Sequence, residues 1–200
     1  MVKKNEFFSP LKLNSSNFFE GKKAEISDII LELPIRRKKL EKNIMDSLNN
    51  YDITVIKAQS GQGKSTLAFQ VVYDLRDRYS VYQLDWCNDE KEIEHFVQFI
   101  ESRVKIGEVP LILIDNLNVE VSSWGALSKE LSNRVQTNYK ILVTSREDDW
   151  YFYGGDRSSL RNINVIELSL SGIQAKEIYL QFKKMMLCIR KLIIGSQLGK

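Results

Sequence analysis

A glycine-rich segment, AQSGQGKST at residues 58–66, constrains this chain more than any other feature. A short apolar run at residues 53–56 precedes it, and a segment with helical periodicity follows it. A glycine-rich turn between a strand and a helix leaves successive backbone N–H groups pointing inward, where phosphate oxygens bind. Lys64 and Ser65 are placed to meet those oxygens and a magnesium ion. The segment therefore matches the Walker A pattern, with Ala58 where the strict pattern has glycine.

Composition agrees with one α/β domain, with or without attachments. The 200 residues are 43% hydrophobic and 28% charged. This length and this hydrophobic content are enough to bury a sizeable core, so the chain is not mainly disordered. The net charge of +3 is too small to indicate a nucleic-acid partner. We interpret the basic run at residues 36–39 as the solvated start of a helix.

The few cysteines and the single histidine limit the chemistry. Cys87 and Cys188 are far apart and lack metal-ligand spacing, which favours a reducing compartment. His95 is the only histidine, which excludes zinc sites built on several histidines. The start of the chain lacks a continuous apolar region, and residues 185–194 are too short and too charged to cross a bilayer. We therefore expect a cytoplasmic protein without a membrane partner.

Five segments have the pattern of strands, and segments with helical periodicity separate them. The predicted strands are residues 53–56, 81–86, 111–114, 140–144 and 164–168. In the second of these, the alternation of Tyr82, Leu84 and Trp86 is the strand signal. Helices are predicted to begin after the glycine-rich turn, at Asn88 or Asp89, at about Ser122 and at Ser171. This alternation predicts a parallel sheet with helices on both faces and right-handed crossovers.

The third predicted strand, LILI at residues 111–114, ends in Asp115. A continuous apolar run suits a strand that is buried on both faces of a parallel sheet. Its terminal aspartate would then lie at the carboxyl edge, where ligands bind in open α/β sheets. The run is typical of a Walker B strand, with Asp115 holding magnesium through water. One strand lies between the two motifs, which favours the additional-strand class of P-loop ATPases over simple nucleotide kinases.

The fourth predicted strand runs directly into Ser145 and Arg146. Arginine is always charged and can make two hydrogen bonds to one phosphate group. Arg146 is therefore a candidate phosphate contact. The alternative is a surface arginine paired with Glu147 or Asp148.

Together these residues meet the needs of a bound nucleotide with magnesium. The expected nucleotide contacts are Gln59, Ser60, Gly61, Gln62, Gly63, Lys64, Ser65 and Thr66. Ser65 and Asp115 are the expected ligands of Mg²⁺, and Lys64, Asp115 and Arg146 are the expected catalytic residues. The predicted cofactors are ATP or ADP and Mg²⁺.

Asn116 follows the expected magnesium ligand, at a position where many hydrolysing relatives carry a second acid. Asparagine can position water, but it cannot act as a general base. We therefore expect hydrolysis to be slow or to depend on another group. Glu147, Asp148 and Asp149 directly follow Arg146 in the sequence, and we interpret them as loop carboxylates.

The segments SGQGKSTLA, LILIDN and ILVTSRE together resemble the STAND NTPases over residues 18–182. These are signalling ATPases related to the NB-ARC and NACHT modules and more distantly to AAA+ proteins. The resemblance implies a P-loop NTPase three-layer sandwich with a parallel five-stranded sheet of order 5-1-4-3-2. It also implies that Arg146, after the fourth strand, senses the terminal phosphate.

Two further segments extend the resemblance. FFEGKKAEI, at residues 18–26, resembles the N-terminal motif that cradles the nucleotide base, with Lys22 where arginine is usual. The pair SGQGKST and SREDDWY is similar to bacterial STAND proteins of the antiviral kind. STAND relatives continue into a helical lid, a winged-helix domain and a sensor region.

The predicted layout has three parts. Residues 1–50 form an N-terminal strap and helix, residues 51–170 the P-loop NTPase core, and residues 171–200 the start of a helical lid that we expect to be truncated. The lid helix is apolar over much of its circumference, so we expect residues 178–194 to promote self-association. The alternative is that it packs wholly on the sheet.

The expected function is an ATP/ADP-binding switch module of a STAND signalling protein, with nucleotide state coupled to oligomerisation and at most weak ATPase activity. Its expected partners are downstream sensor domains or further copies of itself. Two alternatives stay open. A small-molecule or nucleotide kinase needs a substrate-side general base and an arginine-rich lid, and neither is recognisable. An AAA+ type nucleic-acid ATPase needs a basic stripe and an arginine finger that acts in trans.

Overall fold

The computed structural model describes residues 2–3, 24–136, 138–154 and 162–169, together with the helical positions 172, 175, 176, 179, 180 and 183. The chain divides into two compact units, Met1–Leu168 and Ser169–Lys200. The elements below belong to the first unit. The capping residue Ser171 and most of the predicted terminal helix, including most of residues 178–194, lie outside the described residues.

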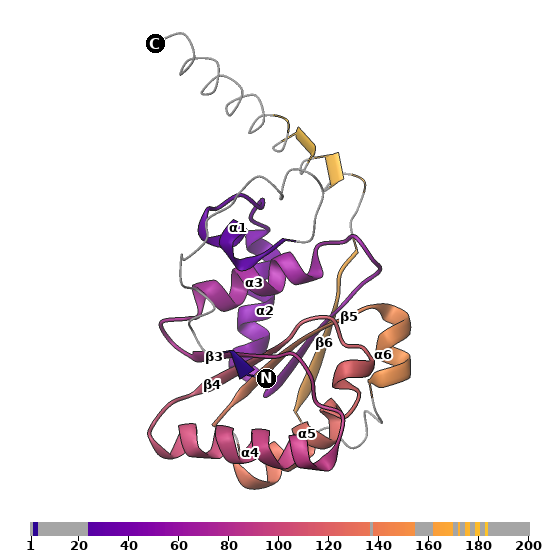
Figure 1. Cartoon of the computed structure of the whole chain (residues 1–200). Helices are drawn as coiled ribbons and strands as arrows, with labels where there is room; N and C mark the ends of the chain where they lie inside the picture. The colour runs from indigo at the N-terminus through magenta and orange to yellow at the C-terminus, as the bar shows by residue number, and fades with distance from the viewer. Residues whose placement is uncertain are drawn as a thin grey trace, which may run out of the picture. The chain divides into compact units, whose positions relative to one another are not determined.

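A six-stranded sheet forms the centre of the first unit (Figure 1). Its strands are β1 (Val2–Lys3), β2 (Ile53–Lys57), β3 (Ser80–Leu84), β4 (Pro110–Ile114), β5 (Lys140–Ser145) and β6 (Ile163–Glu167). Their order is β1-β3-β4-β5-β2-β6. All pairs from β3 to β6 are parallel, so the five predicted strands have the expected order. The short β1 adds an antiparallel edge strand that the sequence did not predict.

Helices cover both faces of the sheet. They are α1 (Ile26–Ile30), α2 (Lys38–Asn50), α3 (Lys64–Asp74), α4 (Glu90–Lys105), α5 (Trp124–Arg134) and α6 (Glu147–Tyr153), with a short 3₁₀ turn at Val119–Val121. The core cluster of one face contains buried residues of α1, α2 and α3, and that of the other face contains residues of α4, α5 and α6. Figure 1 shows these layers on opposite sides of the strands. The three-layer α/β architecture is therefore confirmed.

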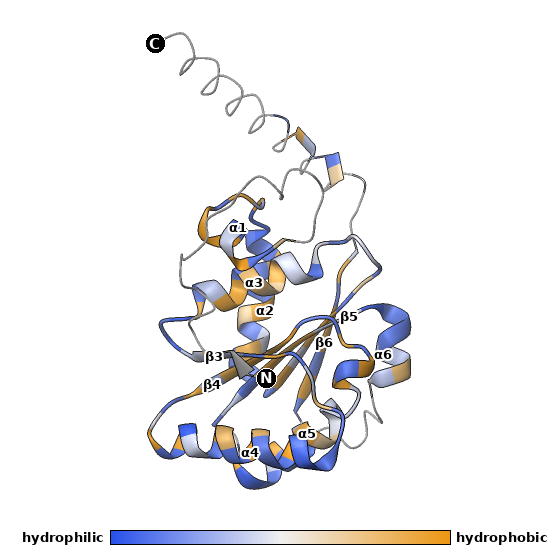
Figure 2. Ribbon diagram, in the orientation of Figure 1, coloured by the Kyte–Doolittle hydropathy of each residue, from blue (hydrophilic) through white to orange (hydrophobic). Residues whose placement is uncertain are grey.

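Alternation along the strands explains this layering. Val55 and Ile53 of β2 belong to the core under α4 and α5, whereas Ile56 belongs to the core under α3. Strand β4 is buried along its whole length, as expected for a central parallel strand. Figure 2 shows the strands largely in the colours of apolar residues between the two helical layers.

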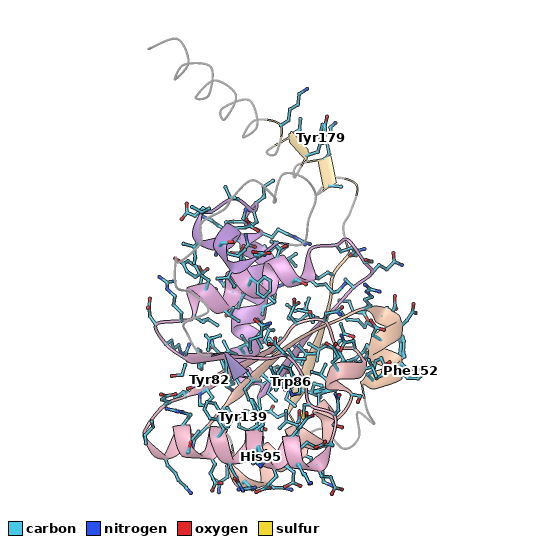
Figure 3. All side chains as sticks on the ribbon, viewed as in Figure 1. Tyr82, Trp86, His95, Tyr139, Phe152 and Tyr179 are labelled. Carbon is cyan, nitrogen blue, oxygen red and sulfur yellow. The ribbon has the colours of Figure 1, made fainter. Side chains whose placement is uncertain are left out.

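Two local expectations were wrong. Glu147, Asp148 and Asp149 are not loop carboxylates, because they form the first turn of α6. Acidic side chains stabilise the first turn of a helix through its dipole, and Trp150 is buried against Trp124 with ring centroids 5.7 Å apart. The second difference is Trp86, which lies beyond the end of β3 and is 43% exposed (Figure 3).

Candidate functional site

The glycine-rich loop connects the end of β2 to the first residue of α3. Gly61 and Gly63 have φ angles of +78° and +77°, in the left-handed region where only glycine is free of strain. Gly63 is also the N-cap of α3. The backbone N–H of Ala58 donates to the carbonyl of Ser145 at 3.2 Å, so the start of the loop is tied to the end of β5. This is the strand, turn and helix arrangement that the Walker A pattern predicts.

Lys64 is buried at the base of this loop. Its Nζ donates to the carbonyl oxygens of Ala58 and Gln59, each at 2.9 Å. Burial lowers the pKa of Lys64, and repulsion by Arg146 lowers it further, whereas the charges of Asp115 and Asp149 oppose the shift. Asp115 after β4, Arg146 after β5 and Asp149 of α6 therefore act electrostatically on the loop lysine. The structure thus brings Lys64, Asp115 and Arg146 together at the carboxyl edge of the sheet.

Asp115 directly follows β4 and is oriented by a side chain of β5. The Thr144 hydroxyl donates to Asp115 Oδ1 at 2.8 Å and accepts the backbone N–H of Asn116 at 2.7 Å. The Thr144 carbonyl accepts the N–H of Leu117 at 2.8 Å. Asn116 has a φ of +70°, and asparagine enters this left-handed region more readily than most residues. Thr144 thus holds the whole turn that carries the expected magnesium ligand.

Thr144 was missed by the sequence analysis. It is fully buried, and its neighbours Ile141, Leu142 and Val143 are buried too. The one feature of the sequence that could have pointed to Thr144 was a hydroxyl residue close to the end of an otherwise apolar strand. A buried hydroxyl requires a hydrogen-bond partner, but the sequence does not tell which one.

The donor groups at this edge fit a magnesium ion. Mg²⁺ prefers hard oxygen ligands and uses one or two carboxylates together with substrate phosphates and water. Asp115 offers a carboxylate that acts on Lys64, and Ser65 is the next residue of the same helical turn. The loop N–H groups and the buried ammonium of Lys64 provide the donors that a polyphosphate requires.

Arg146 is exposed and is the N-cap residue of α6, with extended backbone angles. None of the described acidic residues forms an ion pair with it, so the alternative pairing with Glu147 or Asp148 is not found. Glu147 lies 3.9 Å from Lys57 instead. The Arg146 guanidinium therefore acts on Lys64 electrostatically and forms no ion pair within the described part of the chain.

Lys57, the last residue of β2, is a second lysine that the sequence analysis missed. Its side chain is only 4% exposed, and its Nζ lies 2.6 Å from Glu167 at the end of β6. The hydrogen bond with Glu167 raises the pKa of Lys57, and the Tyr151 ring of α6 lies 5.1 Å from the ammonium. This cluster joins three elements beside the loop. No local pattern in the sequence indicates it, because its members come from distant segments.

The structure also bears on the expectations for the histidine, for metal and membrane binding and for the segment at residues 18–26. His95 lies exposed on α4 (Figure 3), as its position off the buried stripe predicted. Among the described residues, no three His, Cys, Asp or Glu side chains gather as a metal-binding group. No helix in the described part of the chain is long and apolar enough to span a membrane. Lys22 lies outside the described residues, and Glu25 of the same segment is the N-cap of α1.

Comparison with known proteins adds independent information. The sequence profile of the family described as "Novel STAND NTPase 5" matches residues 16–158. No protein with a curated function matches the chain.

Solved structures share the fold. The S. cerevisiae Hsp104–casein complex in its extended conformation has a TM-score of 0.57 at 15% identity, covering 77% of this chain and 31% of that chain. The S. cerevisiae Hsp104–ADP complex has a TM-score of 0.54 at 12% identity, covering 74% and 30%. This chain thus spans less than a third of the length of these solved chains. Likeness at such low identity shows the fold alone.

Proposed function

Because the chain belongs to the Novel STAND NTPase 5 family, we propose that it is an ATP- and ADP-binding switch module whose nucleotide state controls self-association. The turn after β4 gives this proposal its main support. There Asp115 is oriented to hold magnesium, while the next position has Asn116 in place of a second acid. Such a site is suited to holding a nucleotide and poorly suited to consuming it.

Binding is assigned to the loop between β2 and α3. The backbone N–H groups of residues 59–66 would bind the α and β phosphates, and the Lys64 ammonium, now bonded to two carbonyl oxygens, would offer a charged donor to phosphate oxygens. Ser65 and Asp115 hold Mg²⁺, which when bound neutralises charge on the β and γ phosphates.

Slow hydrolysis follows from the chemistry of Asn116. The amide side chain has no basic oxygen, so it cannot accept the proton of an attacking water. Glu147 and Asp148, which directly follow Arg146, lie in the first turn of α6, and Glu147 faces Lys57. We assign no general base among them.

Discrimination between ATP and ADP is assigned to Arg146. Its guanidinium lies near Lys64 and lacks a described carboxylate partner. A ligand can shift a conformational equilibrium only through contacts that differ between the two states. A contact of Arg146 with the third phosphate provides such a difference, because ADP lacks that group.

The wider context of the module is part of the proposal. Residues 1–50 are the N-terminal strap and helix, residues 51–170 the NTPase core, and residues 171–200 the start of a helical lid. Self-association or sensor domains that follow the lid convert the nucleotide state into a cytoplasmic signal. The family membership supports this arrangement, since STAND proteins are signalling ATPases.

Two measurements on the purified chain test the proposal. Single-turnover hydrolysis of ATP should be far slower than the ~1 s⁻¹ lower end of ordinary enzyme turnover. Light scattering should give different masses with ATP and with ADP, and Lys64→Ala should abolish that difference. Turnover above about 1 s⁻¹, or one mass under both conditions, would contradict a nucleotide-controlled switch.

A further inference from the structure

The arginine pair at the start of α2 has a different role from the one its sequence indicates. Residues 36–39 were interpreted as a solvated helix start, and Lys38 and Lys39 are indeed exposed. Arg37 is half-buried, however, and its side chain reaches the glycine-rich loop. The solvated interpretation is therefore wrong for Arg37.

The segment that carries Arg37 is tied to two helices. Glu41 of α2 accepts the backbone N–H of Arg37 at 2.7 Å and also binds the guanidinium of Arg36. Arg36 forms a second ion pair with Asp74 at the end of α3. On the buried side, Gln70 of α3 donates to the carbonyl oxygens of residues 34 and 35, each at 3.3 Å. The backbone at residues 34–37 is thus held against the helix that begins at the glycine-rich loop.

From this anchor, Arg37 approaches the back of the loop. Its Nη1 donates to the carbonyl oxygen of Gln62 at 2.9 Å. The same nitrogen would lie 3.7 Å from a Cβ atom at Gly63, which shows how closely the guanidinium follows the loop backbone. Its Nη2 is buried and has no hydrogen-bond partner among the described residues. Burial lowers the pKa of Arg37, and no described carboxylate pairs with its guanidinium.

The planarity of the peptide bond means that this contact also sets the direction of the Gly63 N–H group. The carbonyl of Gln62 and the N–H of Gly63 belong to one planar trans peptide group, so they point in opposite directions. Holding the carbonyl toward Arg37 therefore aims the Gly63 N–H at the other side of the loop, where phosphate oxygens bind. The charge of Arg37 also adds positive potential on the carbonyl side of that peptide group.

We propose that Arg37 is a positioning residue that holds the glycine-rich loop in its phosphate-binding conformation. The residue acts through the Gln62–Gly63 peptide. The segment before α2 thereby influences nucleotide affinity, since it carries Arg37 and is anchored to α3. This inference rests on the proposed nucleotide-binding function of the same loop.

The test compares Arg37→Gln, Arg37→Lys and a control, Arg78→Gln, in the full chain. Arg78 also links α2 to the segment after α3, through Asn49 at 2.8 Å, but it does not touch the loop. Amide hydrogen exchange of the peptide at residues 59–67, measured without nucleotide, should be faster in Arg37→Gln than in the wild type and the control. Calorimetry should show affinities for Mg·ATP and Mg·ADP that are both lower by about tenfold, the effect of one lost charged hydrogen bond.

Arg37→Lys retains a charged donor, so it should recover most of the affinity and protection that Arg37→Gln loses. Unchanged loop exchange or unchanged affinity in Arg37→Gln would overturn the inference, and so would an equal loss in the control. The exchange measurement does not depend on nucleotide. If the wild type binds neither nucleotide but Arg37→Gln still accelerates loop exchange, the proposed function fails while the positioning role of Arg37 stands.

Discussion

At the scale of single residues, Thr144 shows how a side chain on a central strand controls the group that follows a neighbouring strand. Its hydroxyl donates to Asp115 and accepts from the backbone of Asn116. Both contacts lie in a part of the structure where water is excluded from the hydroxyl, because Thr144 is fully buried. The orientation of the Asp115 side chain therefore depends on a buried residue of the neighbouring strand.

The first prediction is that Thr144→Val weakens magnesium-dependent nucleotide binding by about tenfold, since one charged hydrogen bond is lost and the Asn116 N–H loses its acceptor. Binding of ATP without Mg²⁺ should change much less. Isothermal titration with and without the metal measures both values. Thr144→Ser keeps the hydroxyl and should behave like the wild type. A loss that is equal with and without Mg²⁺ would show that Thr144 serves packing alone.

The second prediction concerns Arg146, which stands beside Lys64 with no described carboxylate partner. Arg146→Ala should reduce ATP affinity by about tenfold, as expected for a charge-assisted contact with phosphate, and ADP affinity by less than about twofold. Competitive titration against a fluorescent nucleotide measures both. Parallel losses for ATP and ADP would instead make Arg146 a general phosphate anchor.

The third prediction is a pH dependence that originates at Cys87. Burial raises the pKa of its thiol from 9.0 to about 11, and the nearby charges of Glu92 and Asp89 act in the same direction. A raised pKa in the folded state stabilises the fold below pH 9, and this contribution is lost as the pH rises from 9 towards 11. Urea unfolding should show a steeper loss of stability over that range in the wild type than in Cys87→Ala. Identical slopes would mean that the thiol is not desolvated.

At the scale of elements, helix α4 illustrates how one side chain determines where a helix begins. Asp89 accepts the backbone N–H of Glu92 at 2.9 Å, and Glu92 accepts the backbone N–H of Asn88 at 2.7 Å. The first bond satisfies an N–H group that a helix start leaves without a partner, and the second ties the residue before the cap to the first turn. The sequence predicted Asn88 or Asp89 as the cap, and the structure selects Asp89.

The fourth prediction follows from this cap. Asp89→Ala should lower the free energy of unfolding by about 1 kcal/mol, the usual cost of removing an N-cap side chain. Asp77→Ala is the matched control, because the Asp77 side chain is 86% exposed and caps no helix. Chemical unfolding of both variants should separate them. Equal effects would show that the Asp89 bond contributes nothing measurable.

The two expectations that failed at this scale have a common cause. Helix α6 has only seven residues, too few to show a period, and it depends on Trp150 packing against Trp124. The Nε1 of Trp124 also donates to the carbonyl of Tyr153 at 2.7 Å, near the end of α6. Likewise, the alternation up to Trp86 does not reveal where the chain leaves the sheet. Both features depend on distant segments, whereas the continuous apolar run of β4 and the buried stripe of α4 are patterns within a single segment of the sequence.

At the scale of the whole molecule, sequence patterns predicted the layers and the strand order because these follow from buried strands and connecting helices. The resemblance to STAND NTPases is confirmed by the family match over residues 16–158. The supporting contacts around the loop could not be predicted in the same way. Arg37 and Lys57 act through partners 25 and 110 residues away, and only the fold brings those partners together.

The contacts of Lys64, Asp115, Thr144 and Arg37 all lead to one expectation, that the loop between β2 and α3 binds a nucleotide with magnesium. Calorimetric titration of Mg·ATP into the wild type and Lys64→Ala tests it most directly, because Lys64 is the buried cation of that loop. The wild type should bind one nucleotide per chain, and Lys64→Ala should bind about tenfold to a hundredfold more weakly. Equal affinity in the two proteins, or no binding by the wild type, would contradict the account.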